Sequence, residues 1–213
     1  MTVVETPRST GLIARVQNIL MKPAAEWDVI ANEAATVPGL FTGYACILAA
    51  IPPLATIVST AVFAHGAIVI ALIAAVLSYI VSLLGVFIIH FIINALAPSF
   101  GATSNGVQAM KLVVYAYTAS WVAGIGNLIP VLGLLIVLAG SIYSLYLMYI
   151  GLPKLMHCPP DKTMVYFIVS LVVAVVVYMV LGMIVGMIML SVTLALAGAV
   201  AVGAAGLAGS GIH

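Results

Sequence analysis

The charged residues of this chain stand in a few short groups, separated by long stretches that contain none. No Asp, Glu, Lys or Arg lies between Lys111 and Lys154 or after Lys162. About a quarter of the residues of a soluble domain are charged, whereas only 5% are charged here and 65% are hydrophobic. Apolar runs longer than the roughly 18 residues that a bilayer-spanning helix needs recur along the chain. The sequence therefore predicts an all-α polytopic membrane helix bundle.

Proline, glycine and turn-rich sequence divide the apolar part of the chain into five predicted spans. Pro52 and Pro53 interrupt the first span, Pro98 ends the second, and Pro130 opens the fourth. The predicted spans cover about residues 40–63, 67–97, 107–126, 130–151 and 164–190. They form a membrane domain over residues 39–190, preceded by N-terminal helices over 1–38 and followed by a small-residue-rich extension over 191–213.

The basic residues predict the orientation of the chain, because Lys and Arg in short loops accumulate on the cytoplasmic side. In the five-span arrangement every Lys and Arg falls on one side of the membrane, so we expect a cytoplasmic N-terminus and a C-terminus outside. Lys111 lies one turn inside the third span, where we expect its stem to snorkel to the interface. The topology anchors are Arg15, Lys22, Lys111, Lys154 and Lys162.

The N-terminal segment has the pattern of an interfacial amphipathic helix. In GLIARVQNILMKP the apolar residues recur at helical spacing and leave Arg15, Asn18 and Lys22 toward a polar side. Pro23 then begins a second short helix, in which Trp27 is expected at headgroup depth. The alternative is that this segment packs against the cytoplasmic loops.

The C-terminal region carries a small residue at nearly every fourth position, a pattern that lets helices pack closely in lipid. We favour packing inside the bundle, and a homo-oligomer interface is the alternative. Residues 164–207 form either one long helix or a span followed by a re-entrant or sixth segment. The residues of the predicted packing seam are Gly182, Gly186, Ser191, Ala195, Ala199 and Gly203.

Polar side chains inside the predicted spans are the candidates for an intramembrane site. His90 and Asn94 share one face of the second span, and Tyr115 and Trp121 belong to the third. These side chains would suit a proton or ion pathway. For His90, a neutral side chain with a structural role is the more common alternative. The break at Pro52 and Pro53 marks either a broken-helix site or a simple kink.

No sequence motif predicts a reaction. The chain has no Gly-x-Ser-x-Gly elbow, no phosphate-binding loop and no His-Glu-x-x-His. His157, Cys158 and Asp161 do not complete a metal shell. We therefore expect no catalytic residue, no metal, no cofactor and no nucleic-acid partner.

Two segments carry a resemblance to a known family. The segment RVQNILMKPAAEWDVIANE joins a basic interfacial helix to a proline and a tryptophan. Residues 106–163 then present a Tyr-rich third span, a Pro-opened fourth span, a Tyr-rich exit and a basic loop. Over about residues 10–190 the chain resembles the Yip (Ypt-interacting protein) family in its short, bacterial-type form.

The resemblance implies a non-enzymatic protein of the bacterial inner membrane that organises or shapes the lipid bilayer. Eukaryotic members bind prenylated small GTPases through a long cytoplasmic N-terminal domain. Here only residues 1–38 precede the first span and the Asp-Leu-x-Gly-Pro signature is absent, so a small GTPase partner is not expected. The alternative function is a pathway for a small solute or an ion through the bundle or an oligomer.

Overall fold

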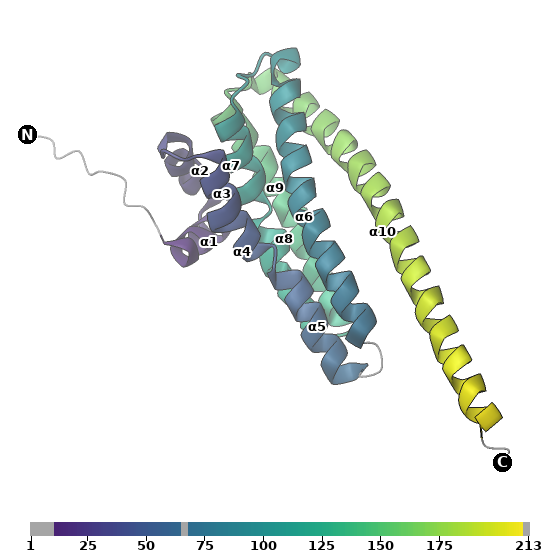
Figure 1. Ribbon diagram of the computed structural model, residues 1–213. Helices are drawn as coiled ribbons and strands as arrows, with labels where there is room; N and C mark the ends of the chain where they lie inside the picture. The colour runs from purple at the N-terminus through teal and green to yellow at the C-terminus, as the bar shows by residue number, and fades with distance from the viewer. Residues whose placement is uncertain (1–10, 65–67, 211–213) are drawn as a thin grey trace, which may run out of the picture.

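The chain forms a helix bundle in the computed structural model, which describes residues 11–64 and 68–210 (Figure 1). No strand occurs among these described residues. Four stretches are long and apolar enough to cross a membrane: Val37–Phe63, Ile68–Phe100, Leu132–Met156 and Pro160–Ala199. The prediction of an all-α integral membrane protein is therefore confirmed, with four rather than five candidate spans among the described residues.

The first stretch is a helix with an interruption before its two prolines. It comprises α3 (Val37–Leu40), a π-helical turn (Phe41–Ala45), α4 (Cys46–Leu48) and α5 (Ile51–Phe63). Pro52 and Pro53 stand in the first turn of α5, where a missing backbone N–H breaks no helical hydrogen bond. The second stretch is α6 (Ile68–Leu96), which continues into a 3-10 turn (Ala97–Phe100).

A broken helix replaces the single helix expected over residues 107–126. It consists of α7 (Gly106–Ala116), α8 (Thr118–Ala123) and a 3-10 turn (Gly124–Leu128), and none of these parts is long enough to cross a bilayer alone. The break leaves N–H groups at the start of α8 without helical partners. One of them, the Ser120 N–H, donates to the Ser144 hydroxyl of a neighbouring helix at 2.9 Å. A tertiary contact therefore supplies the hydrogen-bond acceptor that a regular helix would have supplied.

The next long helix, α9 (Leu132–Met156), begins later and ends later than the sequence predicts. Pro130 lies outside it, and Val131 adopts a positive φ of 70° immediately before its start. The helix runs through Gly151 and Pro153, which the sequence analysis placed at its end. Proline removes one backbone donor but does not terminate a helix whose neighbours hold it in place.

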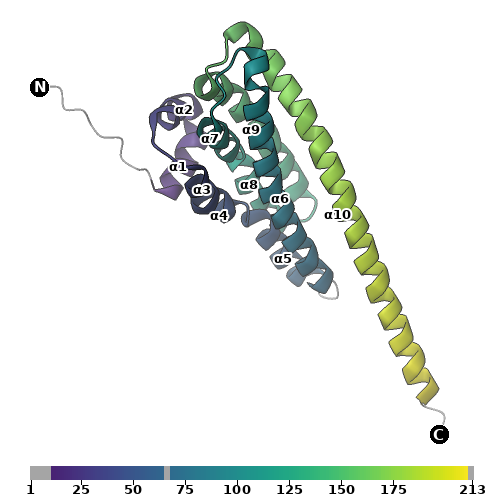
Figure 2. The same ribbon diagram turned by 45° about the horizontal axis from the view of Figure 1, so that its top comes forward.

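The last helix, α10 (Pro160–Ser210), is a single element of 51 residues. At 1.5 Å per residue it spans about 76 Å, more than twice the hydrocarbon thickness of a bilayer. Its first half packs against α6 and α9, and its second half runs away from the bundle in both views (Figures 1 and 2). Of the two alternatives for residues 164–207, the structure therefore adopts the single long helix.

The described residues of the predicted packing seam do not pack inside this chain, so the preference for packing within the bundle is not met. A Cβ atom added to Gly182 or Gly186 would meet nothing within 4 Å. Ser191, Ala195 and Ala199 are exposed. The side-chain surroundings of Gly203 lie outside the described residues. The physical reason is that α10 has already left the bundle where the seam begins.

Both predicted N-terminal helices form, as α1 (Leu12–Met21) and α2 (Pro23–Asn32). They pack on the bundle more closely than an interfacial helix would, because Ile19, Trp27 and Ile30 have no exposed surface. The ring of Trp27 lies so close to Gly151 of α9 that an added Cβ there would stand 2.7 Å away. The segment therefore docks on the helices of the bundle, whereas the alternative expected it to pack against the cytoplasmic loops.

Trp27 should contribute strongly to the stability of the fold. Replacing Trp27 by Ala leaves a large cavity between α2 and α9, so we expect the free energy of unfolding to fall by about 3–5 kcal/mol. Titration with a denaturing detergent, followed by circular dichroism, measures this change. The matched control is Ile13→Ala, because Ile13 is 71% exposed. An equal loss in both variants would contradict the docked position of Trp27.

Candidate functional site

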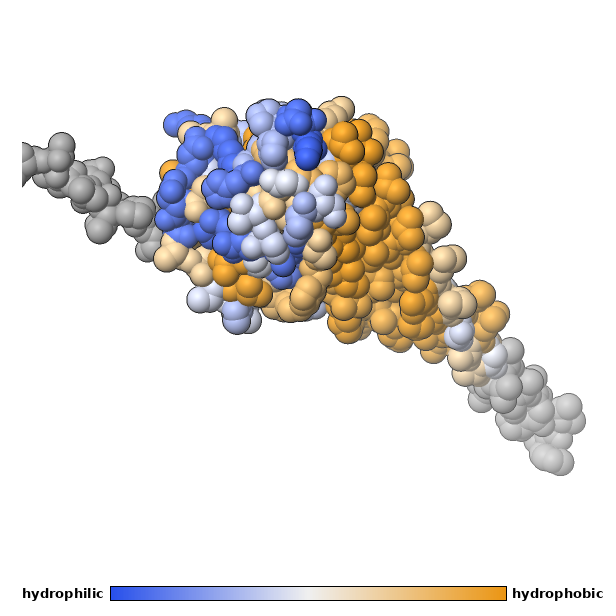
Figure 3. Space-filling model, turned by 90° about the horizontal axis from the view of Figure 1, so that it is seen from above, coloured by the Kyte–Doolittle hydropathy of each residue, from blue (hydrophilic) through white to orange (hydrophobic). Residues whose placement is uncertain are grey.

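The most concentrated set of polar contacts joins the N-terminal helices to the bundle, and we call it the N-terminal clamp. The clamp consists of three cations, Arg15, Lys111 and Lys154, and three carboxylates, Glu26, Asp28 and Glu33. The hydrophilic side chains gather on this side of the molecule, while apolar side chains cover the flank formed by the long helices (Figure 3). The clamp is charge-balanced.

Arg15 is the centre of the clamp. Its two terminal nitrogens form ion pairs with Glu26 and with Glu33, and its side chain is only 4% exposed. The guanidinium carbon also stands 5.5 Å from the centroid of the Tyr115 ring, within range of a cation–π interaction. The sequence analysis placed Arg15 on a polar, solvated face. It is buried instead, because its charge is neutralised by two carboxylates from the next helix and the loop after it.

Lys111 holds the C-terminal end of α2. Its ammonium group donates to the backbone carbonyls of Ile30 at 2.7 Å and Glu33 at 2.6 Å. Helix C-termini carry unsatisfied carbonyls and partial negative charge, so a cation there is stabilising. Gln108, one turn earlier in α7, donates to the Ala31 carbonyl at 3.0 Å. The residue Lys111 is 2% exposed, so it does not snorkel to the surface as predicted.

Lys154 makes the outermost contact of the clamp. From the last turn of α9 it donates to the Ala24 carbonyl and to Asp28 Oδ1, each at 2.6 Å. The Asp28 side chain is 66% exposed, so this pair is solvated and contributes little to stability. Three of the five predicted topology anchors therefore bind the N-terminal helices, whereas Lys22 is exposed between α1 and α2 and Lys162 lies in the first turn of α10.

The four predicted intramembrane residues do not form one site. His90 is buried between the rings of Phe87 and Phe91 on α6, and its Nδ1 has no hydrogen-bond partner among the described residues. Asn94 Oδ1 accepts from the Ser104 hydroxyl at 3.1 Å, on the exposed side of the connection to α7. A polar pathway through His90 would need further polar side chains beside it, and these contacts provide none.

The other two predicted residues lie elsewhere in the bundle. Tyr115 belongs to the N-terminal clamp, where the edges of Trp27 and Tyr44 also pack against it. Trp121 donates from its ring N–H to the Ser82 hydroxyl of α6 at 3.2 Å. Sequence reasoning placed these residues on the correct kind of element but could not place their partners. The sequence-based prediction missed two site residues, Glu26 and Glu33. Their spacing from Arg15 along the chain could have indicated them.

A comparison with known families identifies the family of this chain. The family described as the Yip1 domain matches residues 18–184. The chain belongs to the Yip family. The match begins inside α1 and ends inside α10, so this member of the Yip family carries every residue of the clamp except Arg15 within the matched region. No curated protein and no solved structure matches the chain.

Breaking the clamp at its centre should destabilise the protein. The substitution Arg15→Met leaves the buried Glu26 and the partly buried Glu33 without their cation, so we expect the free energy of unfolding to fall by about 3–5 kcal/mol. Limited proteolysis should then cut between α2 and α3 sooner than in the wild type. Lys154→Met is the matched control, and we expect it to cost less than about 1 kcal/mol.

A compensated variant separates the charge effect from the packing effect. Adding Glu26→Gln and Glu33→Gln to Arg15→Met removes the uncompensated carboxylates, so most of the lost stability should return. A loss that persists unchanged in the triple variant would mean that Arg15 acts through packing on Tyr115 rather than through its charge.

Proposed function

We propose that this Yip-family protein is a non-enzymatic, membrane-organising protein that shapes the bilayer as a wedge. The proposed setting is the bacterial inner membrane, with the clamp at the cytoplasmic side, a cytoplasmic N-terminus and a C-terminus outside. The broken α7–α8 helix then makes the fifth crossing. The observation that carries the proposal is that the buried charges tie extra helices to one half of the bundle instead of meeting at a reaction centre.

The depth of the N-terminal helices supports a wedge. The Tyr143 hydroxyl donates to the Leu20 carbonyl at 2.8 Å, and Tyr143 lies halfway along α9. The end of α1 is therefore level with the middle of a membrane-spanning helix. From there α1, α2 and α3 surround the clamp half of the bundle. Figure 1 shows the bundle broad at α1, α2 and α7 and narrowing toward α5, apart from the diverging α10.

The outer face of the N-terminal helices is suited to lipid. Ile13 is 71% exposed and Met21 is 79% exposed, and both belong to α1. An amphipathic segment that buries apolar side chains in one leaflet expands that leaflet relative to the other, and its binding depends on curvature. The clamp holds α1 rigidly on the bundle. The area that α1 adds to one leaflet therefore widens the whole protein on that side. Such a protein would collect where the cytoplasmic leaflet bends outward.

Transport of a small solute or an ion is the alternative function. The intramembrane polar side chains motivate it, but His90, Asn94, Tyr115 and Trp121 have separate sets of partners. Flux into proteoliposomes that His90→Ala abolishes would support this alternative over the wedge.

Curvature sorting tests the proposed function. The labelled protein is reconstituted into giant vesicles, its orientation is determined, and a narrow membrane tube is pulled from each vesicle. We expect the protein to be enriched in the tube relative to a lipid dye when the clamp side faces outward. The double variant Ile13→Asp/Met21→Asp should lose this enrichment, because charged side chains cannot enter the acyl region cheaply.

The matched control is Ile13→Leu/Met21→Leu, which keeps the surface apolar and should keep the enrichment. Wild-type protein that distributes like the lipid dye in both orientations would refute the wedge.

A further inference from the structure

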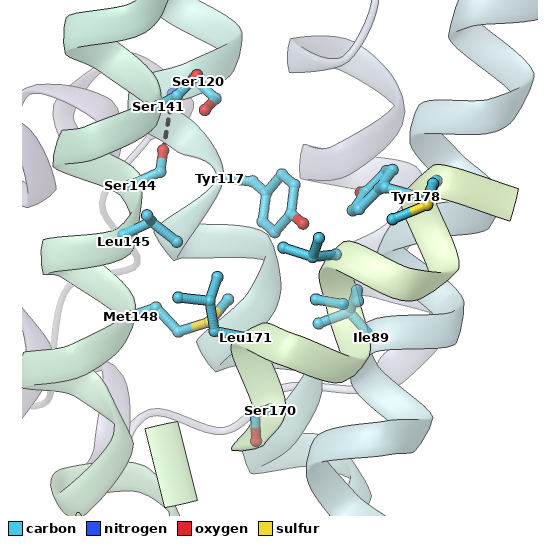
Figure 4. Close-up of a pocket in the computed structure, with 13 residues that line it drawn as sticks. Ile89, Tyr117, Ser120, Ser141, Ser144, Leu145, Met148, Ser170, Leu171 and Tyr178 are labelled. Carbon is cyan, nitrogen blue, oxygen red and sulfur yellow. Dashed lines mark hydrogen bonds between the residues drawn. The ribbon is translucent and has the colours of Figure 1, made fainter. Parts of the chain in front are cut away.

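A large cavity lies between the first half of α10 and the neighbouring helices. Its volume is about 620 Å³, within the range of about 300–1,000 Å³ typical of small-molecule sites. Figure 4 shows Ser120, Ser144 and Met148 on one side, Leu171 of α10 next to Met148, the Tyr117 ring in the middle of the view and Tyr178 on the other side. It belongs neither to the N-terminal clamp nor to the surroundings of His90.

The hydroxyl groups of the α9 wall are already occupied. Ser141 donates to the Val137 carbonyl of its own helix at 2.8 Å. Ser144 accepts the Ser120 N–H at 2.9 Å, the contact drawn as a dashed line in Figure 4. Each of these two hydroxyl oxygens therefore already has a partner within the protein. Only Ser170, at the edge of the cavity, has a buried hydroxyl without a partner among the described residues.

The side of the cavity at α10 faces the lipid. Leu145 of α9 and Val175 and Met179 of α10 line it and are 37%, 52% and 58% exposed. Both helices are candidate membrane spans, so the medium outside these side chains is hydrocarbon rather than water. Water would gain little by entering, because a buried water needs two to four polar partners. An empty space of this size would forfeit the packing contacts of every residue around it.

We propose that this cavity is an intramembrane binding site for a lipid acyl chain. The chain enters between α9 and α10 and lies against Met148, Leu171 and the ring of Tyr178. It supplies the packing that protein side chains do not supply between these two helices, so a bound lipid joins α10 to the bundle. The site recognises a hydrocarbon chain and makes no demand on the headgroup. It is independent of the proposed curvature function, because it uses none of the clamp residues.

Photocrosslinking with a lipid probe tests the site. The full chain is reconstituted into vesicles that contain phosphatidylcholine with a diazirine in the middle of one acyl chain. After illumination, adducts are located by mass spectrometry. We expect adducts on Met148 and Leu171 in excess of those on Val172, which is 56% exposed on the same helix and samples bulk lipid.

Two filling variants approach the cavity from opposite walls. Ala174→Phe from α10 and Ser141→Leu from α9 should each abolish the excess of adducts on Met148 and Leu171. Val172→Phe is the matched control on the exposed face of α10, and it should leave the excess unchanged. If Ala174→Phe does not yield monodisperse protein, Ser141→Leu alone carries the test, because its hydroxyl bonds only within its own helix.

Two results would overturn the proposal. The first is labelling of Met148 and Leu171 no greater than that of Val172. The second is an excess that survives both filling variants.

Discussion

The pairing of Arg15 with Glu26 and Glu33 is the interaction on which the architecture depends. A buried guanidinium beside a membrane-spanning bundle is tolerable only when carboxylates neutralise it and hydrogen bonds satisfy its donors. Both carboxylates come from the residues that follow α1, so the N-terminal helices themselves supply the partners of this buried cation and can lie deep against α7 and α9. Lys111 then fixes this two-helix unit by binding the carbonyls at the end of α2.

The docked unit has a consequence for the centre of the bundle. Every residue from Ala109 to Ala116 of α7 is buried, because α6 and α9 cover some sides of it and the N-terminal helices cover another. A helix enclosed in this way can break, since neighbours rather than lipid meet its freed backbone groups. The Ser120–Ser144 hydrogen bond is one such contact, and the same serines leave the space that becomes the lipid cavity.

The two ends of the chain behave differently for the same physical reason. Lys111 of the bundle binds the carbonyls at the end of α2 and Lys154 pairs with Asp28, so the position of the N-terminal helices is specified. The second half of α10 contains no charge after Lys162 and few polar groups, so nothing directs it toward particular partners. Ser191, Ala195 and Ala199 are exposed there, and the family match ends at residue 184, near the place where the helix leaves the bundle. Membership of the Yip family thus describes the packed part of the molecule.

The sequence by itself determined that this protein lies in a lipid bilayer and that it is helical. It also determined the family and the existence of α1, α2 and the long apolar helices. The membrane location and the helices follow from composition and from local periodicity, whereas the family follows from a resemblance that the Yip1 match confirms. Only the tertiary structure decided that Arg15 and Lys111 are buried, that Trp27 packs on Gly151, that α7 and α8 are separate, and that His90 and Trp121 have different partners. The physical reason is that each of these depends on a partner distant in sequence or on another helix, and hydropathy along one segment carries no information about which charges and hydroxyls will meet.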